Sequence, residues 1–254
     1  MKKKLLISFL SVLMVVACAI GFAACGSDVK NYNTYPNGLI FTLSDNETSY
    51  AVAGIGSCTD SNISIPAEYN GLPVSSINDS AFSNCKFLTN VTIPDTVTSI
   101  GGYAFSWCTS LTSITIPNSV TNIGFNAFGD CDSLESITLP FVGATKDGTE
   151  NTHFGFIFGS NEYDYNISYV PESLKTVVIT GGLSIDDNAF YNCALTSVTI
   201  EDGVTSIGES AFSSCGSLTS VTIPNSMTSI GEYAFSWCSS LTLSLIHISE
   251  PTRH

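Results

Sequence analysis

Positive charge is scarce in this sequence. Among its 254 residues, lysine and arginine together number 8, whereas aspartate and glutamate number 22. Half of the cations are Lys2, Lys3, Lys4 and Arg253, so the body of the chain is very acidic. A protein that binds nucleic acid needs a basic patch to neutralise phosphates. The composition therefore disfavours nucleic acid, and we expect no nucleic-acid partner.

Histidine is also scarce, with 3 residues in the chain. Two of them, His247 and His254, lie in a C-terminal stretch that is set aside below, which leaves His153. A serine or cysteine nucleophile needs a base, most often a histidine held by a carboxylate. No nucleophile motif lies beside His153, and the carboxylates are too scattered to single out a glycosidase pair. We therefore expect no enzyme and no catalytic residue.

Metal-binding motifs are missing as well. No CxxC pair occurs, so a zinc site is not expected. Asp130 and Asp132, like Asp186 and Asp187, are close in sequence, but neither pair lies in a calcium-loop pattern. These carboxylates are interpreted as part of a solvated acidic surface. The sequence predicts no metal and no cofactor.

What the sequence does have is internal repetition. The segment YAFSWC occurs at residues 103–108 and again at 233–238. Leucines that begin similar segments recur at intervals of 21 to 23 residues, with one interval of 40, and an earlier degenerate unit begins at Ile63. These leucines are Leu88, Leu111, Leu134, Leu174, Leu195, Leu218 and Leu241. A period in the twenties is the mark of a leucine-rich-repeat solenoid.

Each repeat is explained as one coil of such a solenoid. In LTSITIP, Ile114 and Ile116 alternate with polar residues, which predicts a strand with one buried face. Pro117 removes a backbone donor and ends the strand. The chain then returns to a short helical turn in which Phe128 and Cys131 face the core. Stacked coils bury apolar side chains that a single coil would leave exposed. The phenylalanines of the repeated Ala-Phe pairs, Phe105, Phe128 and Phe212, are therefore predicted to be buried.

The repeated pattern LxxIxIPxxVxxIGxxAFxxC resembles the BspA-type leucine-rich repeats of bacterial surface proteins, over residues 38–242. The resemblance implies a right-handed, β-rich solenoid with one parallel strand and a short helical turn per repeat of about 23 residues. It also implies exposure at the cell surface, with adhesion or binding of host components described for some members. It supplies no catalytic site.

The N-terminus reads as an export signal. Residues 1–24 have a basic leader, an apolar stretch and small residues before Cys25, as in a bacterial lipoprotein signal peptide. Cys25 is the expected lipidation site, because cleavage there leaves a polar start to the mature chain. Cys18 is a rival site, and an uncleaved membrane anchor is a further alternative. We expect an exported protein, lipid-anchored to the bacterial cell envelope and facing outward.

The rest of the chain divides into four expected parts. Residues 25–37 form a tether, and 38–60 form a capping hairpin with a turn at Ser44, Asp45 and Asn46. The solenoid follows at 61–242. Residues 243–254, LSLIHISEPTRH, break the repeat and resemble a translated sequencing-library adapter. We interpret this tail as an artefact and expect the natural protein to continue with other residues.

Cysteine recurs with the coil, at the same position after each AF pair. The six residues are Cys85, Cys108, Cys131, Cys193, Cys215 and Cys238. Equivalent atoms of stacked coils lie about 4.8 Å apart, a separation that does not exclude disulfides. Parallel side chains nevertheless suit packing better than a disulfide dihedral. A buried ladder of thiols is the preferred interpretation.

Two repeated surfaces are candidates for contact with a partner. The outward positions of the strands are small and polar, as at Ser113 and Thr115, which strand propensity alone explains. Tyr103 with Trp107, and Tyr233 with Trp237, are four residues apart and are predicted to pack on each other. For both surfaces, the local structural explanation is preferred to a binding role.

The insertion at residues 141–173 interrupts the repeat and is rich in aromatic residues. Two functions are considered for it: a clasp in which its phenylalanines dock on the neighbouring coils, and a recognition loop on a rigid scaffold. Tyr163, Tyr165 and Tyr169 are the candidate ligand-binding residues, for a protein or glycoprotein partner. We therefore expect an adhesin-like binding protein. The alternative is a passive scaffold that displays or spaces a domain beyond the C-terminal end.

Overall fold

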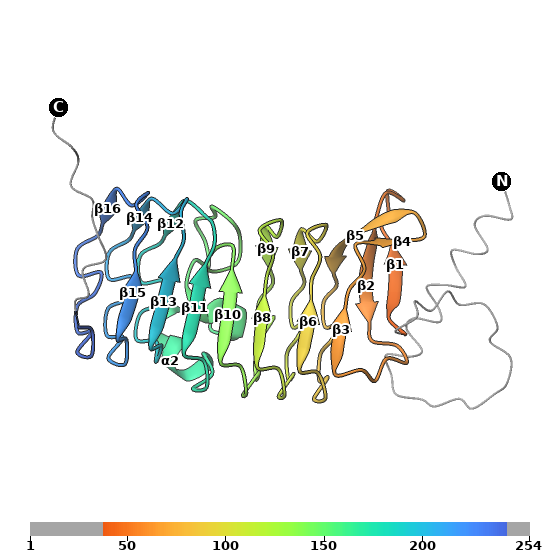
Figure 1. Ribbon diagram of the computed structural model, residues 1–254, viewed down its shortest axis with the longest axis horizontal. Helices are drawn as coiled ribbons and strands as arrows, with labels where there is room; N and C mark the ends of the chain where they lie inside the picture. Colours follow the sequence, from red (N-terminus) through yellow and green to blue (C-terminus); the bar gives the residue numbers. More distant parts are fainter. Residues whose placement is uncertain (1–37, 243–254) are drawn as a thin grey trace, which may run out of the picture. The chain divides into compact units, whose positions relative to one another are not determined.

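The computed structural model describes residues 38–242, which form a parallel β-solenoid of about 8 turns (Figure 1). This architecture confirms the predicted fold class. The expected signal peptide, the tether, lipidation at Cys25 and the adapter-like tail at 243–254 lie outside the described residues. Within residues 38–242, no helix is long and apolar enough to cross a membrane.

The first ladder of the solenoid is built from the strands that the LTSITIP pattern predicts. Ser113, Ile114 and Thr115 pair in register with Ser136, Ile137 and Thr138, and the same register continues to the later coils. The centre of each early strand is buried and its two ends are exposed. The strands form two sheets, one of β3 (Asn62–Ser64) and β6 (Asn90–Thr92), and one of β8 (Ser113–Thr115), β10 (Ser136–Leu139), β11 (Thr176–Ile179), β13 (Ser197–Ile200) and β15 (Ser220–Thr222).

A second ladder uses the return segment of each coil, so each regular repeat contributes two short strands. The sequence predicted the first strand of each repeat but not the second. It consists of β5 (Leu72–Ile77), β7 (Ser99–Ile100) and β9 (Asn122–Ile123) in one sheet, and β12 (Ser184–Ile185), β14 (Ser206–Ile207) and β16 (Ser229–Ile230) in another.

Two antiparallel pairings lie at the N-terminal end of the described chain. Strands β1 (Ile40–Leu43) and β2 (Tyr50–Gly54) form a hairpin, and β2 pairs in parallel with β5 of the second ladder. Strand β4 (Glu68–Tyr69) turns back onto β5 through Asn70 and Gly71, both with positive φ. The hairpin therefore continues the sheet of the second ladder at its first coil.

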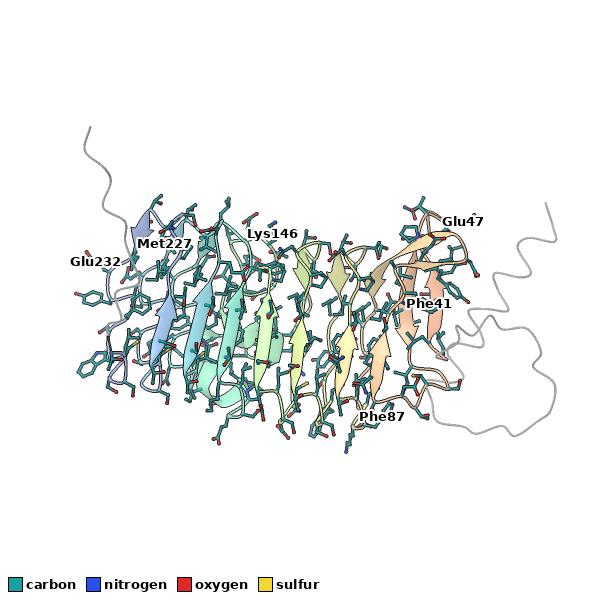
Figure 2. All side chains as sticks on the ribbon, in the orientation of Figure 1. Phe41, Glu47, Phe87, Lys146, Met227 and Glu232 are labelled. Carbon is teal, nitrogen blue, oxygen red and sulfur yellow. The ribbon has the colours of Figure 1, made fainter. Side chains whose placement is uncertain are left out.

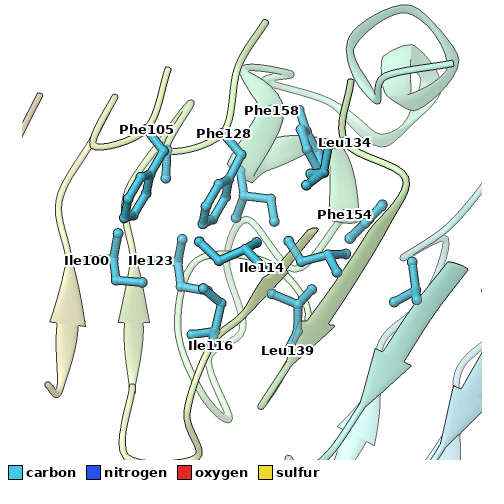
Figure 3. Close-up of a cluster of buried hydrophobic side chains, with 14 of the residues drawn as sticks. Ile100, Phe105, Ile114, Ile116, Ile123, Phe128, Leu134, Leu139, Phe154 and Phe158 are labelled. Carbon is cyan, nitrogen blue, oxygen red and sulfur yellow. The ribbon is translucent and has the colours of Figure 1, made fainter. Parts of the chain in front are cut away.

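The core is a row of phenylalanines between the two ladders. Phe105, Phe128 and Phe212 are fully buried, as predicted. Their rings stack from coil to coil, with centroids 5.4 Å apart for Phe105 and Phe128 and 4.9 Å apart for Phe190 and Phe212. Figure 3 shows Phe105 and Phe128 side by side above the isoleucines of the two ladders. One apolar set is thus shared by successive coils.

The AF segment is the stretch around the Ala-Phe pair of each coil, as at residues 80–84. It is a run of hydrogen-bonded turns rather than a helix. In the first such segment, the N–H groups of Ser80, Phe82 and Asn84 donate to carbonyls of the next coil, at 2.7 to 2.9 Å. The intervening N–H groups of Ala81 and Ser83 donate three residues back within the turn. Alternate donors thus point along the solenoid, which a helix with all its bonds internal does not allow.

This hydrogen-bond pattern requires two left-handed residues four positions apart in every AF segment. The pairs are Ser80 and Asn84, Tyr103 and Trp107, Asn126 and Asp130, Asn188 and Asn192, Ser210 and Ser214, and Tyr233 and Trp237, all with φ between 54° and 64°. Asn, Asp and Ser occupy most of these positions, and Asn and Asp tolerate this conformation best among residues with a side chain. Tyrosine and tryptophan occupy them only in the two YAFSWC copies.

Three short helical elements lie within the insertion. They are η1 (Phe154–Phe158), η2 (Tyr163–Tyr165) and α2 (Asn166–Tyr169). Gly159 ends η1 in a left-handed conformation, with φ 102°. Helix α2 lies at one edge of the coils, beside the first-ladder strands β11 and β13 (Figure 1).

Candidate binding surfaces

The insertion replaces one AF segment of the solenoid. On one side, the N–H of Phe128 donates to the Ile157 carbonyl at 2.8 Å. On the other side, the N–H of Phe154 donates to the Ala189 carbonyl at 2.7 Å. These bonds have the same form as those between regular coils, so η1 is an integral part of the stack. The longer loop that follows it is held on a fixed base.

The phenylalanines of η1 continue the ring stack. Phe154 and Phe158 are buried, and their centroids lie 5.1 Å apart. Phe158 lies against Phe128 at 6.5 Å, and Phe154 lies against Phe190 at 4.7 Å. Phe156 is half-buried and packs edge-on against Phe125. All three phenylalanines of the expected clasp therefore dock on neighbouring coils or on each other.

Asn166 fixes the outer part of the insertion to the solenoid. Its side chain is fully buried, and its Oδ1 accepts a hydrogen bond from the N–H of Gly155 at 2.9 Å. Its Nδ2 donates to the carbonyls of Ala189 at 3.3 Å and Tyr191 at 3.1 Å. One amide thus joins three backbone segments, which satisfies the buried polar groups and sets the position of η2 and α2.

The predicted tyrosines surround this buried amide and face outward. Tyr163, Tyr165 and Tyr169, called the tyrosine patch below, have exposed fractions of 40%, 55% and 46%. Tyr163 packs edge-on against Tyr191, with centroids 5.6 Å apart. Ile167 is also 46% exposed, although it is aliphatic. The arrangement places four large side chains on the outside of a segment whose buried contact is Asn166.

His153 lies beneath the same loop and has a structural contact. It is buried, and its Nε2 lies 3.1 Å from the carbonyl oxygen of Ser160, to which it donates. Burial lowers the pKa of His153, because the charged imidazolium loses its hydration. A neutral histidine bonded to the backbone explains this residue without catalysis.

The repeated cysteines form the expected thiol ladder. The thiols of Cys108, Cys131 and Cys215 are buried, and each donates to a phenylalanine carbonyl of the preceding coil at 3.0 to 3.2 Å. Cys238 makes the same bond to Phe212 from a half-buried position. Burial raises the pKa of Cys131 and that of Cys215 to about 12. These side chains pack the turn and are poor nucleophiles at neutral pH.

The polar face of the first ladder carries a groove of about 590 Å³. Thr92, Thr115 and Thr138 line it along the strands, and Asp95 supplies one carboxylate. At one end, the hydroxyl of Thr180 donates to Oδ1 of Asn118 at 2.6 Å. This side-chain hydrogen bond links a coil before the insertion to the coil after it.

The YAFSWC aromatics differ from the prediction that each pair packs on itself. Tyr103 lies edge-on against Phe125 of the next coil, with centroids 6.0 Å apart. Trp107 is 49% exposed, and Trp237 is 81% exposed. Because Tyr103 and Trp107 occupy separate left-handed positions of a turn, they do not have the geometry of a helical i, i+4 pair.

Sequence reasoning missed two residues of the insertion, Asn166 and Ile167. Asn166 carries no signal in the sequence, because two of its three hydrogen-bond partners, Ala189 and Tyr191, lie in the next coil. Ile167 is an apolar residue of a kind usually found in the core, but it is 46% exposed beside the buried Asn166. Among residues 38–242, no group of three or more His, Cys, Asp or Glu side chains is placed to hold a metal ion.

Comparisons with known proteins show what this chain is similar to. Residues 57–149 and 165–251 match the model of the BspA-type leucine-rich repeat region, in 6 copies. A leucine-rich-repeat protein of T. pallidum is similar in structure, with a TM-score of 0.55 and 26% identity over 83% of this chain and 91% of that chain. A leucine-rich-repeat protein of Bacteroides capillosus has a TM-score of 0.43 and 25% identity, over 58% and 97%. The comparison with curated proteins gave no match.

Proposed function

Because the chain belongs to the BspA-type leucine-rich-repeat family, we propose that it is an adhesin-like bacterial surface protein. It is anchored by a lipid at Cys25 and binds a protein or glycoprotein partner at the cell surface. The family supports a scaffold for protein binding, and the N-terminal residue pattern supports export and anchoring. The solenoid has no catalytic role in this proposal.

The observation that carries the binding role is the exposure of the tyrosine patch on a fixed base. Regular coils repeat the same groups at each step, so discrimination between partners comes from the coil that differs. Tyr165 and Tyr169 present large, rigid side chains, and ordering two χ angles costs little entropy on binding. Aromatic residues of this kind are enriched among the side chains that dominate interface energies.

A binding assay tests this role. The purified full-length chain and the variant Tyr165→Ser with Tyr169→Ser are compared on immobilised extracellular-matrix proteins and on whole bacterial cells. Tyr233→Ser is the matched control, because Tyr233 is 66% exposed on a regular coil. We expect the double variant to lose binding and the control to keep it, with unchanged thermal stability for both. Equal binding by all three proteins would contradict the proposal, and a wild type that binds nothing would favour the passive scaffold.

The anchor is tested separately. Mass spectrometry of the membrane-extracted N-terminal peptide is expected to find an acylated cysteine at position 25, and Cys25→Ser is expected to release the protein from the membrane. Acylation at Cys18, or an unmodified start elsewhere, contradicts this part of the proposal and leaves the binding role intact.

A further inference from the structure

We infer that the tyrosine patch binds an arginine-bearing segment of its protein partner. The inference rests on the proposed function, because it names the chemistry of the partner at the same surface. Its basis is the combination of exposed aromatic rings and exposed carboxylates in one short segment, in a chain with very few cations.

The aromatic half of the surface is set by the helical geometry of η2 and α2. Tyr165 and Tyr169 are four residues apart, so their side chains leave the same side of the helical turn. Asn166 and Val170 are buried on the other side. The ring of Tyr163 packs against Tyr191. The rings of Tyr165 and Tyr169 are therefore the main aromatic contact surfaces for a partner.

The charged half consists of carboxylates that flank these rings. Glu162, Asp164 and Glu172 are all exposed, and they lie within three residues of a patch tyrosine. No lysine or arginine occurs between residues 147 and 174. A partner that covers the tyrosines therefore also meets three negative charges at their margin.

Two of the three lysines of the described chain lie away from this surface, and the third, Lys175, follows Glu172 by three residues at its margin. Residues 38–242 contain 20 acidic residues and three lysines. Lys146 lies at the edge of the coils opposite α2 (Figures 1 and 2). Lys86 belongs to the coil of Phe82, four steps from the coil of Phe190, or roughly 19 Å along the stack. The Nζ of Lys175 donates to the Ala194 carbonyl at 3.4 Å, so this margin holds one positive charge against the three carboxylates.

Arginine is the side chain that matches both halves. Its guanidinium stacks on tyrosine faces and donates in-plane hydrogen bonds to carboxylates, whereas lysine offers a compact, strongly hydrated charge. Charge complementarity also selects against acidic partners, because like charges at an interface are unfavourable. The ligand class is thus a basic, arginine-containing protein segment.

The test uses a synthetic peptide of alternating glycine and arginine, with a glycine and citrulline peptide as its neutral counterpart. The full-length chain is expected to bind the arginine peptide at low salt and to lose most of that binding at high salt. The triple variant Glu162→Gln, Asp164→Asn, Glu172→Gln is expected to weaken binding roughly tenfold. The matched control Glu201→Gln, Asp202→Asn, Glu209→Gln removes the same charge from exposed positions of a regular coil, and its affinity is expected to stay within about twofold.

Two results overturn the inference. Equal binding of the citrulline peptide shows that charge is not recognised, and equal weakening by the two triple variants shows attraction to general acidity alone. These failures are distinguishable from failure of the proposed function. If Tyr165→Ser with Tyr169→Ser abolishes binding to the surface targets while the charge variant does not, the patch is a binding site for a partner of another chemistry.

Discussion

The phenyl rings of Phe105 and Phe128 lie parallel, with an interplanar angle of 1° and centroids 5.4 Å apart. They belong to successive coils, and both are fully buried. Phe105 also stacks on Phe82 of the preceding coil, with centroids 5.0 Å apart, so its removal leaves a cavity that the stacked backbone cannot close.

Phe105→Ala is expected to lower the free energy of unfolding by roughly 3 to 5 kcal/mol, from lost burial and the remaining cavity. Phe87→Ala is the control, because Phe87 is 38% exposed and lies at the outer edge of its turn (Figure 2). Urea denaturation measures both. Similar losses for the two variants would be evidence against the ring stack as the core.

The buried thiols predict a loss of stability at alkaline pH. In the folded protein the pKa of Cys131 is raised to about 12, so the thiol stays protonated where the unfolded chain releases its proton. The stabilising contribution is complete below the ordinary thiol pKa and is lost as the pH rises toward 12. Cys215 behaves in the same way. The slope is roughly 1.4 kcal/mol per pH unit for each thiol.

Urea denaturation between pH 8 and pH 11 under reducing conditions measures this slope. Cys131→Ala and Cys215→Ala are each expected to flatten it, whatever their effect at neutral pH. Tyrosine ionisation contributes equally to wild type and variants, so the difference isolates the thiol. An unchanged slope in both variants would show that these thiols do not resist ionisation.

Asn166→Ala is expected to loosen the insertion. The variant leaves the buried N–H of Gly155 without its acceptor, which costs about 1 to 3 kcal/mol. Limited proteolysis is expected to cleave near η2 and α2 faster than in wild type. Asn161→Ala, an exposed neighbour, is the control. Resistance of Asn166→Ala to cleavage would mean that the buried phenylalanines alone hold the loop.

The left-handed turn positions predict that two substitutions at one residue differ in their effect on stability. Asn84 has φ 63° and an exposed side chain. Asn84→Val is expected to destabilise by about 1 to 2 kcal/mol, because a β-branched residue is strained in this conformation. Asn84→Gly accepts the conformation freely and is expected to stay close to wild type. Thermal unfolding compares the two, and equal melting temperatures would refute a strict left-handed requirement.

The repeat period and the alternation of Ile114 and Ile116 were sufficient to predict the solenoid and its buried phenylalanines. They did not predict that the AF segment is a run of turns rather than a helical turn. A spacing of three residues brings Phe128 and Cys131 to the same side in both structures. The distinguishing signal is the preference for Asn, Ser and Asp at two fixed positions. In the first YAFSWC copy these two positions are Tyr103 and Trp107, so the preference is not visible there.

The antiparallel turn between β4 and β5 had a local signal that the repeat pattern obscured. Asn70 and Gly71 form a dipeptide typical of tight hairpins. The tyrosine patch is a different case. Its aromatic composition was visible, but its exposure depends on Asn166 reaching Ala189 and Tyr191, contacts that span 23 and 25 residues. No local pattern predicts such a contact.

The two ladders respond differently to the insertion. The first passes through it, because β10 pairs directly with β11. The second sheet ends at β9, where Asn122 forms an isolated antiparallel bridge with Thr145, and a separate sheet begins at β12. Nearest-neighbour coupling sets how far unfolding propagates in a repeat array. At the coil that carries the patch, coupling between neighbours therefore runs through the first ladder and the AF segments alone, and we expect the second ladder to open there more readily than between regular coils.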